Sequence, residues 1–177
     1  MVAENEGVVA ANLKPEEEDS AAGVFVRSEL FAKAFGEGMG LVELTANYLD
    51  GAGREASRHL SRSAALAYAS ASMRLTTLLM QIASWLLVLR AVREGEMTLV
   101  EARDEKYRLP ERCLPLGDMR ELGLPEELMS LAEQSSQLYA RIARIDAEIF
   151  GDARAPARVR DAAAQQRALF DAFGQKL

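Results

Sequence analysis

The chain has 177 residues, 49% of them apolar, and a formal net charge of −6. This length and apolar fraction suit one folded domain with a substantial core. The acidic balance, without a run of basic residues among aromatics, argues against binding to DNA or RNA, which needs a basic surface. The single cysteine, Cys113, can form no intramolecular disulfide, and the N-terminus lacks the basic and then apolar layout of a secretory signal. We therefore expect a cytoplasmic protein.

The N-terminal part of the chain predicts a disordered tail over residues 1–27. These residues hold six acids against two bases and include the acidic run Glu16–Asp19. Large apolar side chains are too few in residues 1–23 to offset the entropy lost on ordering the chain. An acidic run of this kind is more typical of a solvated surface than of a cation site.

The first helix is predicted from about Glu29 to Leu49. Ser28 is suited to the N-cap, and apolar residues then recur at spacings of four and three along one side. Gly51 and Gly53 follow directly and supply stop signals for a helix.

Three glycines, Gly36, Gly38 and Gly40, fall inside this predicted helix. Each costs about 0.5–1 kcal/mol relative to alanine in a helix interior. They indicate either a close approach by another backbone or a local kink or later helix start. The sequence leaves both interpretations open.

The central segment, residues 54–94, predicts one long helix of about 41 residues and roughly 60 Å. One side carries an unbroken heptad seam, formed by Ala64, Tyr68, Ala71, Leu75, Leu78, Ile82, Trp85, Leu89 and Val92. A second stripe lies roughly 200° away and comprises Leu66, Met73, Thr77, Met80, Ser84 and Leu87. This helix is therefore apolar on two opposite sides.

The apolar part of this helix is too short to predict a membrane span. The longest uncharged run is Leu75–Leu89, whose fifteen residues include Thr76, Thr77, Gln81 and Ser84. A bilayer span needs about 20 predominantly apolar residues. We therefore expect no transmembrane segment.

After the helix stop at Gly95, Thr98 and Glu101 form a capping-box pattern that predicts a short helix to about Lys106. Residues 107–124 contain two prolines and show no sustained periodicity, so we expect a loop. This loop is a candidate partner-binding segment because it carries more apolar surface than a connector needs, notably Leu114, Leu116 and Met119.

A third helix is predicted from Pro125, a residue suited to the first turn, to the stop signal at Gly151. Apolar residues again recur at alternating spacings of four and three along it. Residues 152–177 are rich in alanine, arginine and proline at their start, and we expect a mobile C-terminal tail.

Together these segments predict an all-α fold, an antiparallel three-helix bundle over residues 28–151 with a long central helix. If the seam packs inside the bundle, the second stripe stays in water. Its apolar residues then form a candidate face for a homodimer or another partner, namely Met73, Thr77, Met80 and Leu87. The alternative is that the first and third helices straddle the central helix and cover both stripes.

The residue inventory indicates no catalytic, cofactor-binding or metal-binding site. His59 is the one histidine, and Glu55 is the one acid at helical spacing that could orient it. Cys113 has no histidine or second cysteine near it in the sequence. The glycine-rich run at 36–40 lacks the preceding strand and the following Lys-Ser or Lys-Thr of a phosphate loop. We therefore expect a protein that is not an enzyme and needs no cofactor.

Four stretches of the chain form a recognisable set. They are EGMGLVE at 37–43 with YLDG at 48–51, SMRLTT at 72–77 with LMQIASWLL at 79–87, RAVREGEM at 90–97, and ARI with IFG between 138 and 151. This set resembles the alphaproteobacterial regulator of CtrA degradation (RcdA) family. The resemblance covers roughly residues 36–98 and 138–151, whereas residues 107–124 and both tails depart from the family pattern.

The resemblance implies a dimer of three-helix bundles that acts as a non-enzymatic adaptor for the ClpXP protease. It further implies association with a CpdR-like response regulator at the protease, and recruitment of CtrA-like cargo with a PopA-like effector at the cell pole. The alternative function is a structural helical dimer or scaffold without a role in proteolysis.

Overall fold

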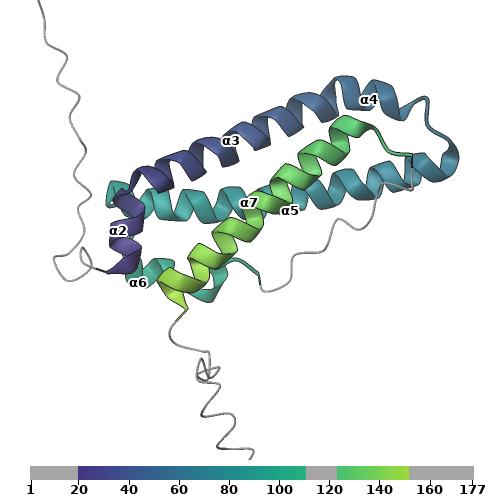
Figure 1. Ribbon diagram of the computed structural model, residues 1–177. Coiled ribbons are helices and arrows are strands. Elements are labelled where there is room, and N and C mark those ends of the chain that lie inside the picture. The colour runs from purple at the N-terminus through teal and green to yellow at the C-terminus, as the bar shows by residue number, and fades with distance from the viewer. Residues whose placement is uncertain (1–19, 111–122, 152–177) are drawn as a thin grey trace, which may run out of the picture.

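The computed structural model describes residues 20–110 and 123–151, and the regular secondary structure of these residues is all helical, with no strand among them (Figure 1). The predicted all-α fold is thus confirmed for the described residues. The elements are α2 (Ala21–Arg27), α3 (Glu29–Asp50), α4 (Ala52–Ser57), α5 (Arg62–Glu94), α6 (Leu99–Ala102), the 3-10 helix η1 (Glu105–Tyr107) and α7 (Glu126–Phe150).

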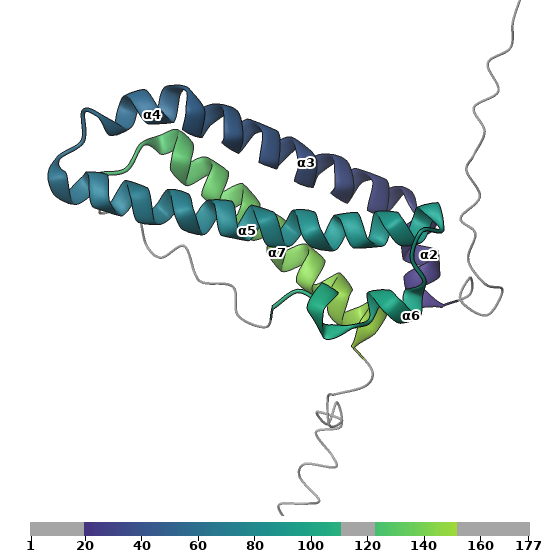
Figure 2. The ribbon, with the colours of Figure 1, turned by 180° about the vertical axis from the view of Figure 1, so that it is seen from behind.

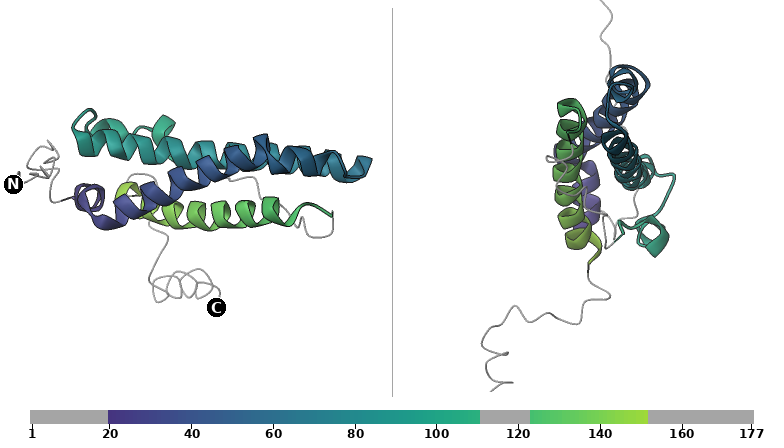
Figure 3. Two further views of the ribbon diagram at one scale, coloured as in Figure 1. Left: turned by 90° about the horizontal axis from the view of Figure 1, so that it is seen from above. Right: turned by 90° about the vertical axis from the view of Figure 1, so that its right-hand side faces the viewer.

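The three long helices α3, α5 and α7 pack against one another (Figure 3). Along α3, Phe35 lies against Arg90 of α5, and Gly38, one turn later, lies against Leu86. The two helices are therefore antiparallel. Figure 1 shows that α7 also runs opposite to α3, so α5 and α7 run in the same direction. The predicted antiparallel order is wrong for this last pair.

The direction of α7 follows from the path of the chain before it. After η1, Arg108 contacts Asp146 near the end of α7, and the carbonyl of Pro110 then accepts a 2.7 Å hydrogen bond from the Tyr139 hydroxyl. Residues 108–110 thus run along α7 from near its end toward its start. Short connections force neighbouring helices to be antiparallel, and a long one removes that requirement.

Helix α2 corrects the boundary of the predicted disordered tail. The Ser20 side chain caps it by accepting a 3.0 Å hydrogen bond from the Gly23 N–H. Phe25 and Val26 are buried in the core, and the Phe25 ring lies 6.2 Å from Trp85. The tail predicted over 1–27 is therefore wrong at residues 21–27, because a two-turn helix can bury its apolar side against an existing core. The remaining tail residues, 1–19, and the predicted C-terminal tail, 152–177, lie outside the described residues.

The predicted helix over 54–94 is two helices, α4 and α5, with a break between Ser57 and Arg62. Ser61 has an extended backbone (φ −60°, ψ 160°) and its hydroxyl accepts a hydrogen bond from the Ala64 N–H at 3.3 Å. Ser61 therefore starts a new helix instead of continuing α4. Helix α5 has 33 residues and a length of about 50 Å.

Helix α3 confirms the predicted helix over 29–49. Ser28 caps it through a 3.2 Å hydrogen bond from the Phe31 N–H, and it ends before Gly51. A Cβ atom on Gly38 would lie 2.5 Å from Leu86 Cδ1, whereas Gly36 and Gly40 have no such neighbour within 4 Å. The close approach at Gly38 is thus made by side chains of α5 and α7 and not by another backbone, and the later helix start is wrong.

The corner between α3 and α5 depends on another glycine, Gly53 in α4. A Cβ atom there would lie 2.6 Å from both Tyr48 Cε1 and the Tyr68 hydroxyl oxygen. Both tyrosine side chains are buried. Burial raises the pKa of Tyr48 to about 12, with smaller contributions from Tyr68 and the charge of Glu127. A larger residue at 53 would push these rings apart.

The predicted capping box opens α6. The Thr98 hydroxyl accepts a hydrogen bond from the Glu101 N–H at 3.2 Å, and the Glu101 carboxylate accepts one from the Thr98 N–H at 2.9 Å. Hydrogen bonds from the Thr98 backbone and hydroxyl lower the pKa of Glu101. Helix α6 ends at Ala102, and η1 replaces the predicted continuation to Lys106. Of the predicted loop 107–124, residues 111–122 lie outside the described residues.

The contact at Gly38 can be tested with a matched pair of glycine variants. We expect Gly38→Ala to lower the free energy of unfolding by about 1–3 kcal/mol, because overpacking a buried contact displaces its neighbours. We expect Gly36→Ala in the same helix to raise it by about 0.5–1 kcal/mol, because alanine has the better helix propensity and meets no neighbour. Urea denaturation measures both values, and equal effects at the two positions would contradict the close approach.

Candidate interaction surface

One side of α5 forms the centre of the core. The predicted seam is buried from Tyr68 to Val92, and Leu75, Ile82, Leu89 and Val92 have no exposed surface. Leu79 and Leu86 join the seam and widen the buried side. This side is covered by α3 and α7 along its length and by α2 and α6 toward its C-terminal end.

The opposite side of α5 carries an exposed apolar surface, which we name the α5 outer face. It comprises Leu66, Met73, Thr77, Met80, Ser84 and Leu87. Leu66, Met73, Met80 and Leu87 are exposed by 75, 72, 64 and 51%. In Figure 2, α5 lies in front of α7, and neither α3 nor α7 covers the side of α5 that faces the viewer. The alternative in which α3 and α7 cover both stripes is therefore wrong. The dimer contact proposed for this face stays a prediction.

Thr77, at the middle of the outer face, and its exposed neighbour Thr76 are already hydrogen-bonded within the helix. The Thr76 hydroxyl donates to the Ser72 carbonyl and the Thr77 hydroxyl donates to the Met73 carbonyl, each at 2.9 Å. Burying a polar group is costly when its hydrogen bond is lost. These two hydroxyls would keep their acceptors if another surface covered them, so the middle of the face is suited to burial.

Charged residues lie at the two ends of the outer face. Arg62 precedes Leu66 by one helical turn, and Arg90 pairs with Glu94 at 2.7 Å beyond Leu87. Between Arg62 and Arg90 the sequence holds one charged residue, Arg74. The outer face is thus an apolar strip, about 32 Å long, that ends in charges.

Length and composition alone would allow α5 to cross a membrane, and among the described helices it alone meets that criterion. In the structure, 44% of the apolar window is buried by the rest of the chain. A core helix satisfies the same criterion, so the result is weak evidence for a span.

A buried polar cluster ties α5, α7 and the segment after η1 together. Asp146, exposed by 6%, accepts a 2.8 Å hydrogen bond from the Trp85 indole nitrogen. Arg108 forms a bidentate pair with the same carboxylate, at 2.9 and 2.8 Å. Its guanidinium also donates to the Phe150 carbonyl at 3.3 Å and stacks over the Phe150 ring at 4.9 Å. Arg108 therefore neutralises the buried acid and caps the end of α7.

Sequence reasoning missed this cluster. Asp146 follows Ile142 by four residues and so lies at a core-facing position of an otherwise apolar repeat. An acid at such a position indicates a buried partner, because an unpaired buried charge is very unfavourable. The partner, Arg108, is 38 positions away and could not be identified from spacing.

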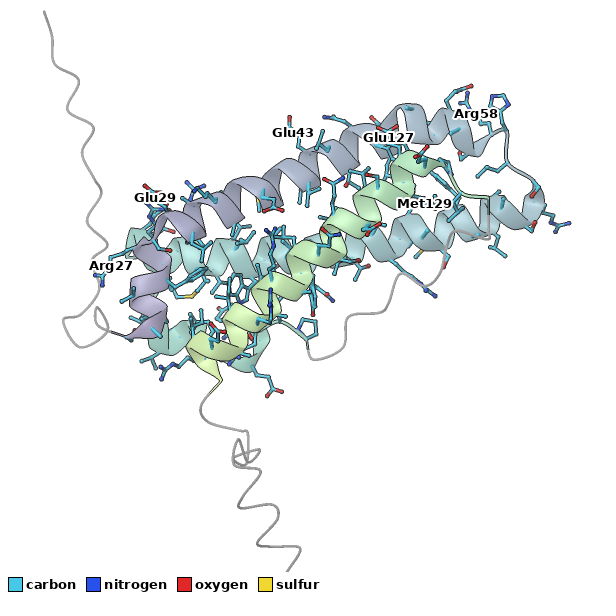
Figure 4. All side chains as sticks on the ribbon, viewed as in Figure 1. Arg27, Glu29, Glu43, Arg58, Glu127 and Met129 are labelled. Atoms are coloured by element: carbon cyan, nitrogen blue, oxygen red, sulfur yellow. The ribbon has the colours of Figure 1, made fainter. Side chains whose placement is uncertain are left out.

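The α4 corner carries basic residues at the end of the molecule opposite α2. Figure 4 labels Arg58 at this end and Arg27 at the other. Arg58 pairs with Glu55 at 2.7 Å, and His59, whose side chain is 79% exposed, lies 3.8 Å from the same carboxylate. His59 lies in the turn after α4 and not within a helix.

The other predicted site residues fall in the undescribed segment. Leu114, Leu116 and Met119, the candidate partner loop, lie outside the described residues, as does Cys113. Within residues 20–110 and 123–151, no three His, Cys, Asp or Glu side chains gather in a group that could hold a metal ion.

Comparisons with known proteins place the chain among its relatives. A family model described as "Protein of unknown function (DUF1465)" matches residues 22–173. Among solved structures, the crystal structure of RcdA from Caulobacter crescentus CB15 is 52% identical, with a TM-score of 0.60. The alignment covers 71% of this chain and 95% of RcdA. A search of curated proteins finds no match.

The polar cluster around Asp146 can be tested by removing its cation. We expect Arg108→Ala to lower the free energy of unfolding by about 3 kcal/mol, because it leaves a buried carboxylate without its ion-pair partner. Denaturation followed by the fluorescence of Trp85, the single tryptophan, measures this loss directly at the cluster. Arg144→Ala, which removes an exposed arginine of α7, is the matched control and should change stability by less than about 0.5 kcal/mol. Equal losses in the two variants would contradict a contribution of the Arg108–Asp146 ion pair to the free energy of unfolding.

Proposed function

The chain belongs to the DUF1465 family and is an RcdA-like protein, and from this premise we propose that it is a non-enzymatic adaptor in regulated proteolysis. In this role it links ClpXP, primed by a CpdR-like response regulator, to cargo such as the cell-cycle regulator CtrA, with a PopA-like effector as a further partner. The proposal places this activity in the cytoplasm and at the cell pole. The observation that carries it is the 52% identity to RcdA over 95% of that chain.

The physical character of the molecule supports an interaction role. The α5 outer face presents four large apolar side chains that are each at least half exposed. Contiguous exposed apolar surface of this kind is more often a site of protein–protein contact than a surface that stays in water. We propose that this face holds two copies of the chain together as a homodimer, each copy an assembly of three long helices.

The dimer proposal can be tested by placing charges on the outer face. We expect light scattering to report a mass near twice 19.4 kDa for the unaltered chain. Met80→Glu combined with Leu87→Glu should raise the dissociation constant by about 100-fold or more, roughly 2.7 kcal/mol, because four carboxylates would be buried without partners. The helical circular dichroism signal should stay unchanged because both residues are exposed in one copy.

The matched control for these substitutions is Leu44→Glu on α3, a leucine that is 58% exposed and lies off the outer face. This variant should remain dimeric. A monomeric unaltered chain at micromolar concentration, or a double variant that stays dimeric, would contradict the dimer contact.

The adaptor proposal is tested by a reconstituted degradation assay with ClpXP, a CpdR-like regulator and CtrA-like cargo. Adding the chain should lower the cargo concentration for half-maximal degradation by about tenfold, because tethered cargo has a high effective concentration at the protease. The maximal rate should change less. If the chain leaves the degradation rate unchanged at every cargo concentration while all partners are present, the scaffold function without a protease role is the better account.

A further inference from the structure

The α4 corner concentrates positive charge in a chain that is acidic overall. Residues 54–62 contain three arginines, one histidine and a single acid, Glu55. The three arginines less the one glutamate give this stretch a formal charge of +2, whereas the whole chain has −6. We name its four cationic residues the basic corner, and all four are exposed: Arg54, Arg58, His59 and Arg62.

The arginines of the basic corner are placed where their charge is unfavourable for the helices that carry them. Arg54 and Arg58 are four residues apart with a helical backbone at Arg58 (φ −71°, ψ −22°), and like charges at this spacing repel. Arg62 is the first residue of α5, whose first turn contains no acid. A cation at the N-terminal end of a helix opposes the partial positive charge of that end. An anionic partner bound at the corner would offset both repulsions.

Two of these arginines have no partner within the described chain. Glu55 lies 2.7 Å from Arg58 and 3.8 Å from His59, so the one acid of the corner is already shared between two cations. Within residues 20–110 and 123–151, neither Arg54 nor Arg62 forms an ion pair. Their guanidinium groups are therefore available to an acidic group from outside the chain.

Acids on the neighbouring helices do not neutralise the basic corner. Asp50 ends α3 and Glu127 lies near the start of α7, toward the end of the molecule where Figure 4 labels Arg58. Among the described residues, neither acid forms an ion pair with a cation of the corner. The corner thus keeps its positive charge in the folded chain.

The backbone beneath the basic corner is held in place by the core. Gly53 is buried against the side chains of Tyr48 and Tyr68, and the Ser61 hydroxyl caps α5. Ordering a flexible segment opposes association, and a surface that is already ordered avoids that loss. A partner therefore meets a corner whose main chain needs no further ordering.

The size of the corner limits which anionic partner it fits. Arginine makes bidentate hydrogen bonds with carboxylates and phosphates. Strong binding to DNA draws on about 6–10 phosphate contacts, which is more than three arginines and a histidine provide. The negative charge of the rest of the chain also repels a long polyanion. A short run of carboxylates can place its charges on the corner alone.

The chain's own acidic run, Glu16–Asp19, cannot reach the corner of the same molecule. It lies within four residues of Ser20, the cap of α2, which is about 14 Å of extended chain. Helix α3 separates α2 from the α4 corner, and its 22 residues span about 33 Å. The carboxylates must therefore come from another protein molecule.

From these observations we propose that the basic corner is a docking surface for a short acidic segment of a partner protein, whose carboxylates pair with Arg54 and Arg62. This inference goes beyond the proposed function and rests on neither the dimer contact nor the protease. It gives the α4 corner a binding role separate from that of the α5 outer face.

The inference is tested by an NMR titration of the isotope-labelled full chain with a hexaglutamate peptide. We expect the backbone amide resonances of residues 54–63 to shift, and added salt to weaken the binding because exposed charges are screened. Hexaglutamine, the uncharged control, should leave these resonances unchanged.

A matched pair of charge reversals tests the assignment to the corner. Arg62→Glu should raise the dissociation constant of hexaglutamate by about fivefold or more, because an attraction becomes a repulsion. The same variant should raise the urea midpoint of unfolding, because an acid suits the first turn of a helix. Arg144→Glu makes the same charge change at an exposed position of α7 and should change the dissociation constant by less than about twofold.

The remaining outcomes each contradict the inference. Absence of shifts at residues 54–63, or equal weakening by the two charge reversals, would exclude the corner as a docking surface. Equal shifts with inorganic phosphate would make it a site for small anions only, and tighter binding of a short DNA duplex would make it a nucleic-acid surface. Either result would overturn the assignment to an acidic protein segment. The adaptor role is tested independently by the degradation assay.

Discussion

The burial of one side of α5 is the constraint on which the rest of the structure depends. Helices α2, α3, α6 and α7 all pack against this helix. Trp85 stands where several of these contacts meet, since its ring lies near Phe25 of α2 and its indole nitrogen donates to Asp146 of α7. The seam has almost no exposed surface. The sides of α3 and α7 that pack against it must therefore be apolar.

Periodic contacts are the part of this structure that the sequence predicts well. The positions of α3 and α7, and the buried seam of α5, follow from apolar residues at the helical period. Helix α2 has seven residues, which is too short for a period to be visible, and its burial depends on a core formed by distant segments. The sequence does not predict the break before α5, because no large apolar residue lies between Arg54 and Arg58. Without one, a change in the helical repeat cannot be seen there. That break depends on the Ser61 cap and on the two tyrosines packed over Gly53.

The direction of α7 could not be predicted for a different reason. A heptad pattern predicts which side of a helix is buried. It does not predict whether the neighbouring helix runs parallel or antiparallel to it. The decisive contacts are between residues far apart in the sequence, Arg108 with Asp146 and Pro110 with Tyr139. The ion pair holds the returning segment on α7 and stabilises the end of that helix. The candidate interaction face was predictable because it repeats the helical period, whereas the cluster that orders the connection was not.

The outer face follows from the same constraint as the core. Helices α2, α3 and α7 place their buried sides on the seam, and Arg108 and Pro110 hold the returning chain against α7. Within the described part of the chain, no element remains to cover Met73, Met80 and Leu87. A helix that is apolar on all sides is typical of the interior of an assembly. Helix α5 has the composition of an interior helix but a cover on one side, so its sequence is best explained by a second surface that completes the interior.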